Sequence, residues 1–119
     1  MTSPPAITFG TIYHIFNRGN NRENIFVEGK NYLYFLVKYA QIVSPITDTY
    51  AYCLLRNHFH ILVRIKDVEE TGGGKCGRKP GQIFGDFFNA YAKAINARYQ
   101  RTGALFQHPF WRVEVKSDA

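Results

Sequence analysis

Residues 57–63 constrain this chain more than any other stretch, because they place two histidines beside a continuous apolar run. The stretch reads Asn-His-Phe-His-Ile-Leu-Val. Successive side chains of a β-strand point to opposite faces, so His58 and His60 share one face, with Cα atoms roughly 6.6 Å apart. Phe59 and Ile61 then take the other face and become buried. The pattern predicts a strand with one buried face and one histidine-bearing face.

The histidine pair has two interpretations. Two neutral imidazoles on one stiff strand can hold a single divalent cation, which makes His58 and His60 candidate metal ligands. The same pair also fits a strand that is half exposed, with both rings facing solvent and no metal. The spacing alone does not decide between these interpretations.

The chain carries an excess of basic and aromatic side chains. Its 119 residues suffice for one domain with one core, its formal net charge is +6, and 16% of its residues are aromatic. Phosphates need Lys and Arg, and unpaired bases stack on aromatic rings, so this composition favours a nucleic-acid partner. The alternative is that the aromatic residues fill a small core while the charge maintains solubility.

Neither a membrane partner nor an oxidising compartment is indicated. No apolar run approaches the roughly 20 residues of a membrane span, and residues 1–6 lack the pattern of a signal peptide. Cys53 and Cys76 have no His or Cys at zinc-finger spacing, and two cysteines do not make a disulfide framework. We therefore expect a cytoplasmic protein.

Hydrophobic periodicity predicts an alternation of strands and helices along the chain. The expected elements are strands over 11–16, 47–55, 58–65 and 110–116, helices over 31–43 and 82–100, and a flexible glycine-rich loop over 67–81. A turn at Arg56 and Asn57 is too short for anything but an antiparallel hairpin. This order is the ferredoxin-like βαββαβ arrangement of the α+β class, an antiparallel sheet with two helices on one face. We expect one domain spanning 1–119.

Basic and amide side chains cluster at places that we predict to contact DNA. The loop after the first strand combines Asn and Arg side chains with backbone amides, which suit phosphate oxygens and base edges. An ordinary strand-exit turn explains the same residues, since Asn and Gly favour turns. The polar face of the second helix is basic and continues past the helix end. The predicted contacts are Asn17, Arg18, Asn20, Arg22, Lys93, Arg98, Arg101 and Arg112.

His58-Phe59-His60 matches the motif histidine–hydrophobic–histidine, and the stretches around it match a known family. The chain resembles the single-tyrosine HUH transposases, and within them the REP-associated tyrosine transposase-like group. The resemblance covers nearly the whole chain in the order of the family, which makes it more specific than the histidine motif alone. The matching stretches are 13–19, 25–26, 50–55, 57–63, 88–91 and 101–107.

This resemblance implies cleavage and rejoining of single-stranded DNA at hairpin-bearing ends. In the family a tyrosine attacks a DNA phosphate, which leaves a 5′-phosphotyrosine link and a free 3′-OH. A divalent metal, Mg²⁺ or Mn²⁺, is held by the two histidines, here His58 and His60, and by a third polar side chain. The implied partner is single-stranded or hairpin DNA. Members of the family pair by joining their sheets or act alone, so a homodimer is an open alternative.

The chain departs from the family pattern at its end. In the family the nucleophilic tyrosine and the third metal ligand lie on a helix after the last strand, whereas this sequence ends at Ala119. We therefore expect the nucleophile to lie beyond Ala119 and the chain to be inactive as a truncated transposase. Among the tyrosines present, Tyr91 is the best alternative, but its place on an apolar helix stripe with Phe84 and Phe88 favours packing in the core.

Two other function classes stay open. The first is a nucleic-acid-binding module without catalysis, in which the sheet and the basic helix hold DNA or RNA. The second is a zinc hydrolase that uses the His-x-His pair with a third ligand. Asp48, Asp86 and Glu114 have no recognisable ligand spacing for that role. His14 approaches the pair only if its strand neighbours theirs.

Overall fold

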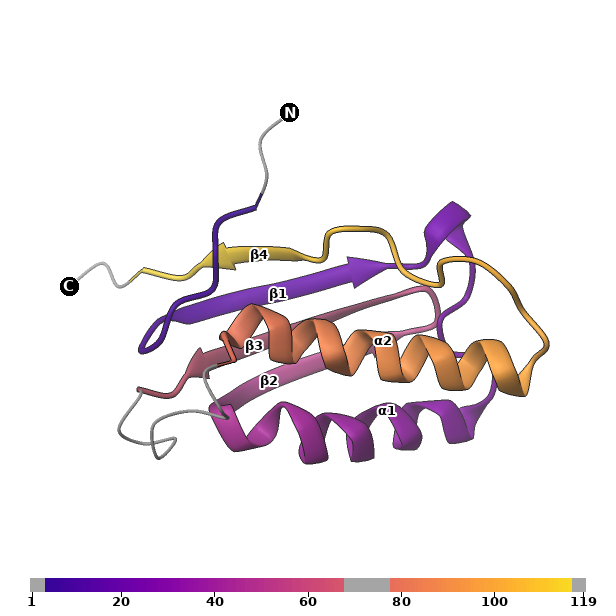
Figure 1. Ribbon diagram of the computed structural model, residues 1–119, viewed down its shortest axis with the longest axis horizontal. Coiled ribbons are helices and arrows are strands. Elements are labelled where there is room, and N and C mark those ends of the chain that lie inside the picture. The colour runs from indigo at the N-terminus through magenta and orange to yellow at the C-terminus, as the bar shows by residue number, and fades with distance from the viewer. Residues whose placement is uncertain (1–3, 68–77, 117–119) are drawn as a thin grey trace.

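The structure, a computed structural model, describes residues 4–67 and 78–116. Four strands form one sheet, and two helices run along it (Figure 1). The elements are β1 (Ile12–Arg18), the 3-10 turn η1 (Asn20–Arg22), α1 (Gly29–Ile42), the 3-10 turn η2 (Ser44–Ile46), β2 (Thr47–Leu55), β3 (His58–Ile65), α2 (Pro80–Arg98) and β4 (Trp111–Glu114).

The sheet is antiparallel throughout, with strand order β2-β3-β1-β4. This order confirms the predicted ferredoxin-like βαββαβ arrangement of the α+β class. β1 and β3 lie in the centre of the sheet, and β2 and β4 form its edges. β2 and β3 make a hairpin with its turn at Arg56 and Asn57, as the short connection between them predicts.

The two helices bury one face of the sheet. Along β3, buried residues alternate with half-buried ones, and Phe59 is fully buried. The centroid of its ring lies 5.5 Å from that of Phe35 on α1 and 5.3 Å from that of Phe88 on α2. Both helices therefore cover the same face, and the alternation predicted for residues 58–65 is confirmed. We term the other side the open face, because no helix of the described chain covers it.

Both helices begin two residues earlier than the periodicity predicts, because each has a favourable first turn. α1 begins at Gly29 rather than Asn31, since the Asn31 side chain accepts a hydrogen bond from the Glu28 backbone N–H group at 2.8 Å. α2 begins at Pro80 rather than Gln82, because proline has no N–H group to leave unpaired there and its φ angle suits the first helical position.

The remaining differences concern the ends of elements. β1 continues to Arg18, two residues beyond its expected end, and β4 is shorter than the expected strand over 110–116. Residues 68–77, the body of the predicted flexible loop over 67–81, lie outside the described residues. Among the described helices, none combines the length and the apolar character that crossing a membrane requires.

Candidate nucleic-acid and metal site

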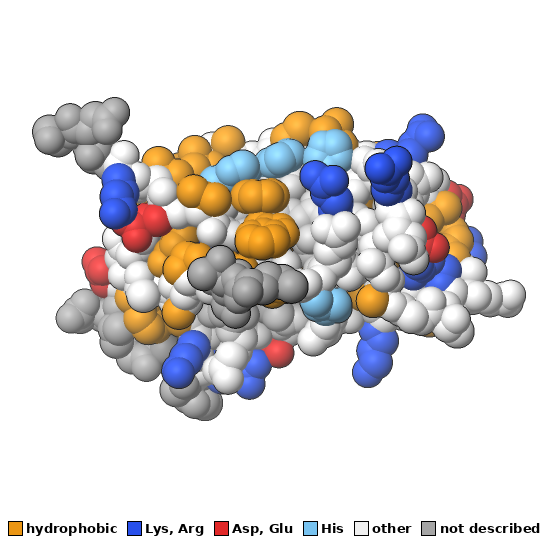
Figure 2. All heavy atoms as spheres, turned by 90° about the horizontal axis from the view of Figure 1, so that it is seen from above, with side chains coloured by type: hydrophobic (Ala, Val, Ile, Leu, Met, Phe, Trp, Pro, Cys, Tyr) orange, Lys and Arg blue, Asp and Glu red, His pale blue; other side chains and the backbone are white. Residues whose placement is uncertain are grey.

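The open face brings histidines from two strands together. In the β1–β3 pairing, Phe16 lies opposite His60, and Arg18 lies opposite His58. Residues directly opposite one another in an antiparallel pair point to the same face, so these side chains share the open face. Figure 2 shows histidine side chains in a row, with hydrophobic side chains beside them and Lys and Arg side chains at one end.

His14 is the third histidine of this face. Its Nε2 atom lies 2.9 Å from Nδ1 of His60, and the ring centroids of His58 and His60 are 5.3 Å apart. His58 Nδ1 lies 2.8 Å from Oδ1 of Asn57, an acceptor, so the ring proton sits on Nδ1 and the Nε2 atom keeps its lone pair. A proton on Nδ1 of His60, donated to His14, leaves His60 Nε2 with a lone pair in the same way. With the ring proton on Nδ1 in both histidines, each ring would have its Nε2 atom free to bind a metal.

The surroundings of His60 favour its neutral form. Partial burial is the largest cause that lowers the pKa of the His60 imidazole below 6.5, followed by the nearby His14 and His58 rings. A neutral imidazole is the form that binds metals, since a protonated ring has no free lone pair. The electrostatics of His60 therefore agree with the role of ligand.

The donor set consists of two imidazoles without a carboxylate. Within residues 4–67 and 78–116, no three His, Cys, Asp or Glu side chains come together as a metal site. Asp48 pairs with Arg64 at 2.7 Å, and Asp86 pairs with Arg78 at 2.6 Å, so neither carboxylate is directed to the histidines. Among the residues that the structure describes, a zinc hydrolase finds no third ligand beside the pair. Two imidazoles fit a metal such as Mn²⁺ whose other ligands are water and phosphate oxygens.

Two arginines lie next to this pair. A pocket of about 350 Å³ is lined by Arg18, Arg22, Asn57 and His58, and we term it the arginine pocket. Arg18 ends β1, and Arg22 follows in η1 with a left-handed φ of 61°. Guanidinium groups bind phosphate oxygens through two parallel hydrogen bonds, which suits this pocket to a DNA phosphate.

Backbone contacts hold the arginine-bearing loop against the β2–β3 turn. The N–H group of Gly19 donates to the carbonyl oxygen of Asn57 at 2.9 Å, and that of Ile25 donates to Arg56 at 2.8 Å. A side chain at position 19 has no room, because a Cβ atom there would lie 2.0 Å from the carbonyl oxygen of Glu23. The glycine thus lets the loop fold back tightly beside the histidines.

Of the two asparagines predicted to contact DNA, Asn17 holds the loop together. Its side chain is buried, its Nδ2 donates to the carbonyl oxygen of Gln107 at 2.7 Å, and its Oδ1 accepts from the Arg18 N–H group at 2.9 Å. Asn20 is half-buried, and its N–H group donates to the carbonyl oxygen of Leu105 at 2.8 Å. These contacts tie the exit of β1 to the segment that precedes β4.

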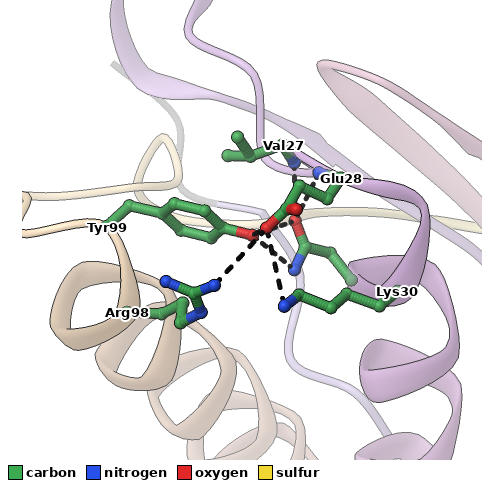
Figure 3. A network of polar contacts seen from close by, with 6 residues as sticks. Val27, Glu28, Lys30, Arg98 and Tyr99 are labelled. Carbon is green, nitrogen blue, oxygen red and sulfur yellow. Dashed lines mark hydrogen bonds and ion pairs between the residues drawn. The ribbon is translucent and has the colours of Figure 1, made fainter.

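The second helix places its basic residues away from the histidines. The buried stripe of α2 faces the covered side of the sheet, so the exposed Lys93 lies on the outer surface of the helical layer. Figure 3 shows Arg98 beside Glu28, 4.0 Å away, in a network that joins the start of α1 to the end of α2. Tyr99 donates to the same carboxylate, and Lys30 lies 3.8 Å from it. Helical periodicity identified these side chains as exposed without showing which side of the molecule they occupy.

Arg101 and Arg112 line neither the histidine-bearing pocket nor the arginine pocket. Arg101 pairs with Glu23, so the end of α2 is linked to the loop after β1. Arg112 lies opposite Ile15, which is fully buried, and therefore belongs to the covered side of the sheet. Its guanidinium carbon lies 4.0 Å from the centroid of the Phe110 ring, and burial lowers the pKa of Arg112. Thus Arg18 and Arg22 adjoin the histidines, whereas the basic residues of α2 and β4 do not.

Tyr91 lies in the core. Its side chain is fully buried, and its hydroxyl donates to the carbonyl oxygen of Ile25 at 2.6 Å. Burial raises the pKa of this hydroxyl well above its usual value of 10. A phenol in this state neither reaches a DNA phosphate nor ionises easily, so packing is its role in this fold.

The structure adds three residues that the sequence patterns did not assign to the site, namely Phe16, Gln107 and Trp111. A second pocket, of about 140 Å³, adjoins the arginine pocket, and we term it the histidine pocket. It is lined by Phe16, Asn17, Arg18, His58, His60, Gln107 and Trp111. Gln107 comes from the segment between α2 and β4, and Trp111 from the start of β4. The alternation within 110–116 predicts that Trp111 and Arg112 point to opposite faces of the sheet. Gln107 belongs to the stretch 101–107 that resembles the family, but no sequence pattern placed it beside the histidines.

Comparisons with known proteins bear on the fold. No family model matches the chain, and no curated protein sequence matches it. Among solved structures, that of a REP-associated tyrosine transposase bound to a REP hairpin is similar, with a TM-score of 0.68 and a match over 98% of this chain. The sequence identity is 13%, and the match spans 62% of the transposase chain. At this identity the likeness shows a shared fold.

Proposed function

We propose that this chain is a DNA-binding domain of the single-tyrosine HUH transposase type. It holds single-stranded or hairpin DNA on the open face, with a divalent metal at His58 and His60. The observation that carries this proposal is the meeting of the histidine pair with Arg18 and Arg22 in two adjoining pockets. The shared fold with a hairpin-bound transposase supports it.

Each group has a chemical role in this proposal. His58 and His60 bind Mg²⁺ or Mn²⁺ through Nε2, and imidazole suits Mn²⁺ better than Mg²⁺, which prefers oxygen. A metal held there would supply Lewis-acid polarisation of one DNA phosphate. Arg18 and Arg22 neutralise neighbouring phosphates and set the path of the strand. In the family this chemistry leads to a 5′-phosphotyrosine intermediate, but none of the seven residues that line the histidine pocket is a tyrosine.

The alternative function is a nucleic-acid-binding module without strand cleavage. It is favoured by the buried position of Tyr91 and by the absence of tyrosine from the lining of the histidine pocket. In this alternative His58 and His60 contact the bound strand or its metal, and no covalent intermediate forms. The two functions differ in one product, a protein–DNA adduct.

The test is incubation of the chain with a labelled DNA hairpin that carries a single-stranded flank, with and without Mn²⁺. We expect binding that Mn²⁺ strengthens in the wild type and not in His58→Ala. A denaturation-resistant adduct would assign strand cleavage to this chain, whereas metal-dependent binding without an adduct supports the non-catalytic function. The absence of binding at low salt would contradict both functions. Arg98→Ala, on the outer side of the helical layer, is the matched control.

Two further predictions belong to this proposal. Association into a homodimer is one, since Trp111, Val113 and Val115 are exposed apolar side chains on or next to the edge strand β4. Sedimentation over a range of concentrations measures it. The other is a cytoplasmic location.

A further inference from the structure

The histidine pocket has a stacking surface that no ring of the described chain occupies. Trp111 lies opposite Phe16 on the open face, and 43% of its surface is exposed. The Phe16 ring contacts the rings of His14, at 4.7 Å between centroids, and His60, at 5.9 Å. Trp111 makes no ring contact with any described residue. Its indole is therefore available to a planar ligand that enters from solvent.

Gln107 supplies a polar group to the same pocket. Its backbone is held on both sides, because its N–H group donates to Arg18 at 3.0 Å and its carbonyl oxygen accepts from Asn17 at 2.7 Å. Its side-chain amide has no hydrogen-bond partner among the described residues. An amide offers one acceptor and two donors in a plane, which matches the edge of a nucleobase.

The size and the charge of the surroundings limit what can enter. A volume of about 140 Å³ is well below the roughly 300–1,000 Å³ of pockets for drug-sized ligands, so it suits one base and not a base pair. Arg18 lines both this pocket and the arginine pocket, so a ligand that fills one is joined to a phosphate site in the other. A nucleotide of a single strand has this combination of a planar base and a neighbouring phosphate.

We propose that the histidine pocket takes one unpaired base of the bound strand, which stacks on Trp111 and presents its edge to the amide of Gln107. This inference rests on the proposed function, because the strand is held there by the arginine pocket. The inference adds a base-binding site next to the place where a metal at His58 and His60 would meet a DNA phosphate. Such a site would give the protein a preference for certain DNA sequences. Stacking accepts every base, whereas the amide distinguishes among their edges.

The first experiment changes the DNA and leaves the protein intact. A hairpin with a short single-stranded flank is made with an abasic site at each flank position in turn, and binding is followed by the fluorescence of Trp111, the single tryptophan of the chain. We expect an abasic site at one position to weaken binding roughly 5-fold to 150-fold and to abolish the fluorescence change. The other positions should show neither effect.

The second experiment tests whether that position meets these residues. In Trp111→Leu the penalty of the abasic site should disappear, measured by the anisotropy of labelled DNA, whereas Trp111→Phe should keep part of it. Gln107→Ala should bring the affinities for the four bases at that position closer together. Tyr50→Leu, an exposed aromatic on β2, and Gln41→Ala, on α1, are the matched controls, and far-ultraviolet circular dichroism verifies that each variant is folded.

The outcomes separate this inference from the proposed function. Hairpin binding with a uniform abasic scan would overturn the base-binding site and leave the proposed function in place. A penalty that persists unchanged in Trp111→Leu would also overturn it, since the base would then lie elsewhere. The absence of hairpin binding at low salt would contradict the proposed function and this inference together.

Discussion

The two faces of β3 give neighbouring residues opposite tasks. Phe59 is fully buried among aromatic rings of both helices, whereas His58 and His60 on either side of it are half-buried and line pockets. A residue removed from the buried face leaves a cavity that the helices cannot fill. A residue removed from the open face leaves space that water fills. Stability and function can therefore be altered separately at adjacent positions of one strand.

The largest effect is expected on the buried face. Phe59→Ala should lower the free energy of unfolding by about 3–5 kcal/mol, because a large aromatic side chain is lost from a packed core. Its ring contacts Phe35, Phe88 and Phe106 with centroids 5.3–5.9 Å apart. Urea denaturation measures the change. The matched variant His60→Ala should lower the free energy of unfolding by less than about 1 kcal/mol, as expected at sites away from core packing. An equal loss in both variants would show that the two faces of β3 do not differ in their contribution to stability.

The next effect concerns metal binding on the open face. His58→Ala should weaken Mn²⁺ binding by at least about 10-fold. Loss of a residue that only orients a metal ligand already lowers the affinity by about this factor, and loss of the ligand itself should lower it further. Isothermal titration measures the affinity, and the melting temperature verifies that the fold is kept. His108→Ala, an exposed histidine outside the pocket lining, should bind Mn²⁺ like the wild type. Equal affinities in His58→Ala and the wild type would remove His58 from the metal site.

A smaller effect distinguishes the two sides of the molecule in DNA binding. Arg18→Ala should reduce the slope of log K against log salt by about 1, because one phosphate contact is lost. Arg98→Ala and Lys93→Ala, in the helical layer, should leave the slope unchanged. Filter binding over a range of salt concentrations measures all three. A reduced slope in the helical variants would move the DNA to the other side of the sheet.

The smallest effect is expected in the exposed network at the ends of the helices. The hydrogen bond from Tyr99, together with Lys30 and Arg98, lowers the pKa of Glu28 below 4.5. A carboxyl group whose pKa is lower in the folded than in the unfolded state contributes stability above pH 4.5. This stability is lost as the pH falls from 4.5 through the pKa of the folded state. Tyr99→Phe should therefore make the loss of stability below pH 4.5 shallower. Denaturation at several pH values measures it, and an unchanged profile would contradict the linkage.

Much of the fold was predictable because local patterns and burial agree. The alternation around His58 correctly placed Phe59 in the core and both histidines on the other face, since the strand period is a local property. The structure likewise confirmed the predicted order of strands and helices, and with it the βαββαβ fold. The helix starts at Gly29 and Pro80 were missed by two residues, because capping depends on side chains that periodicity ignores.

The candidate site was predictable only in part. The period of a strand follows from the sequence alone, and it identified His58 and His60 as a pair on one face. Which segments meet that pair depends on the tertiary structure, because pairing between distant parts of the chain brings β1, η1 and the segment before β4 to it. The tertiary structure placed His14, Arg18 and Gln107 beside the histidines and Lys93 and Arg98 on the far side of the sheet. Arg18, Lys93 and Arg98 are all basic residues that the sequence predicts to be exposed. In the folded chain Arg18 lines the two pockets at the histidines, whereas Lys93 and Arg98 lie on α2.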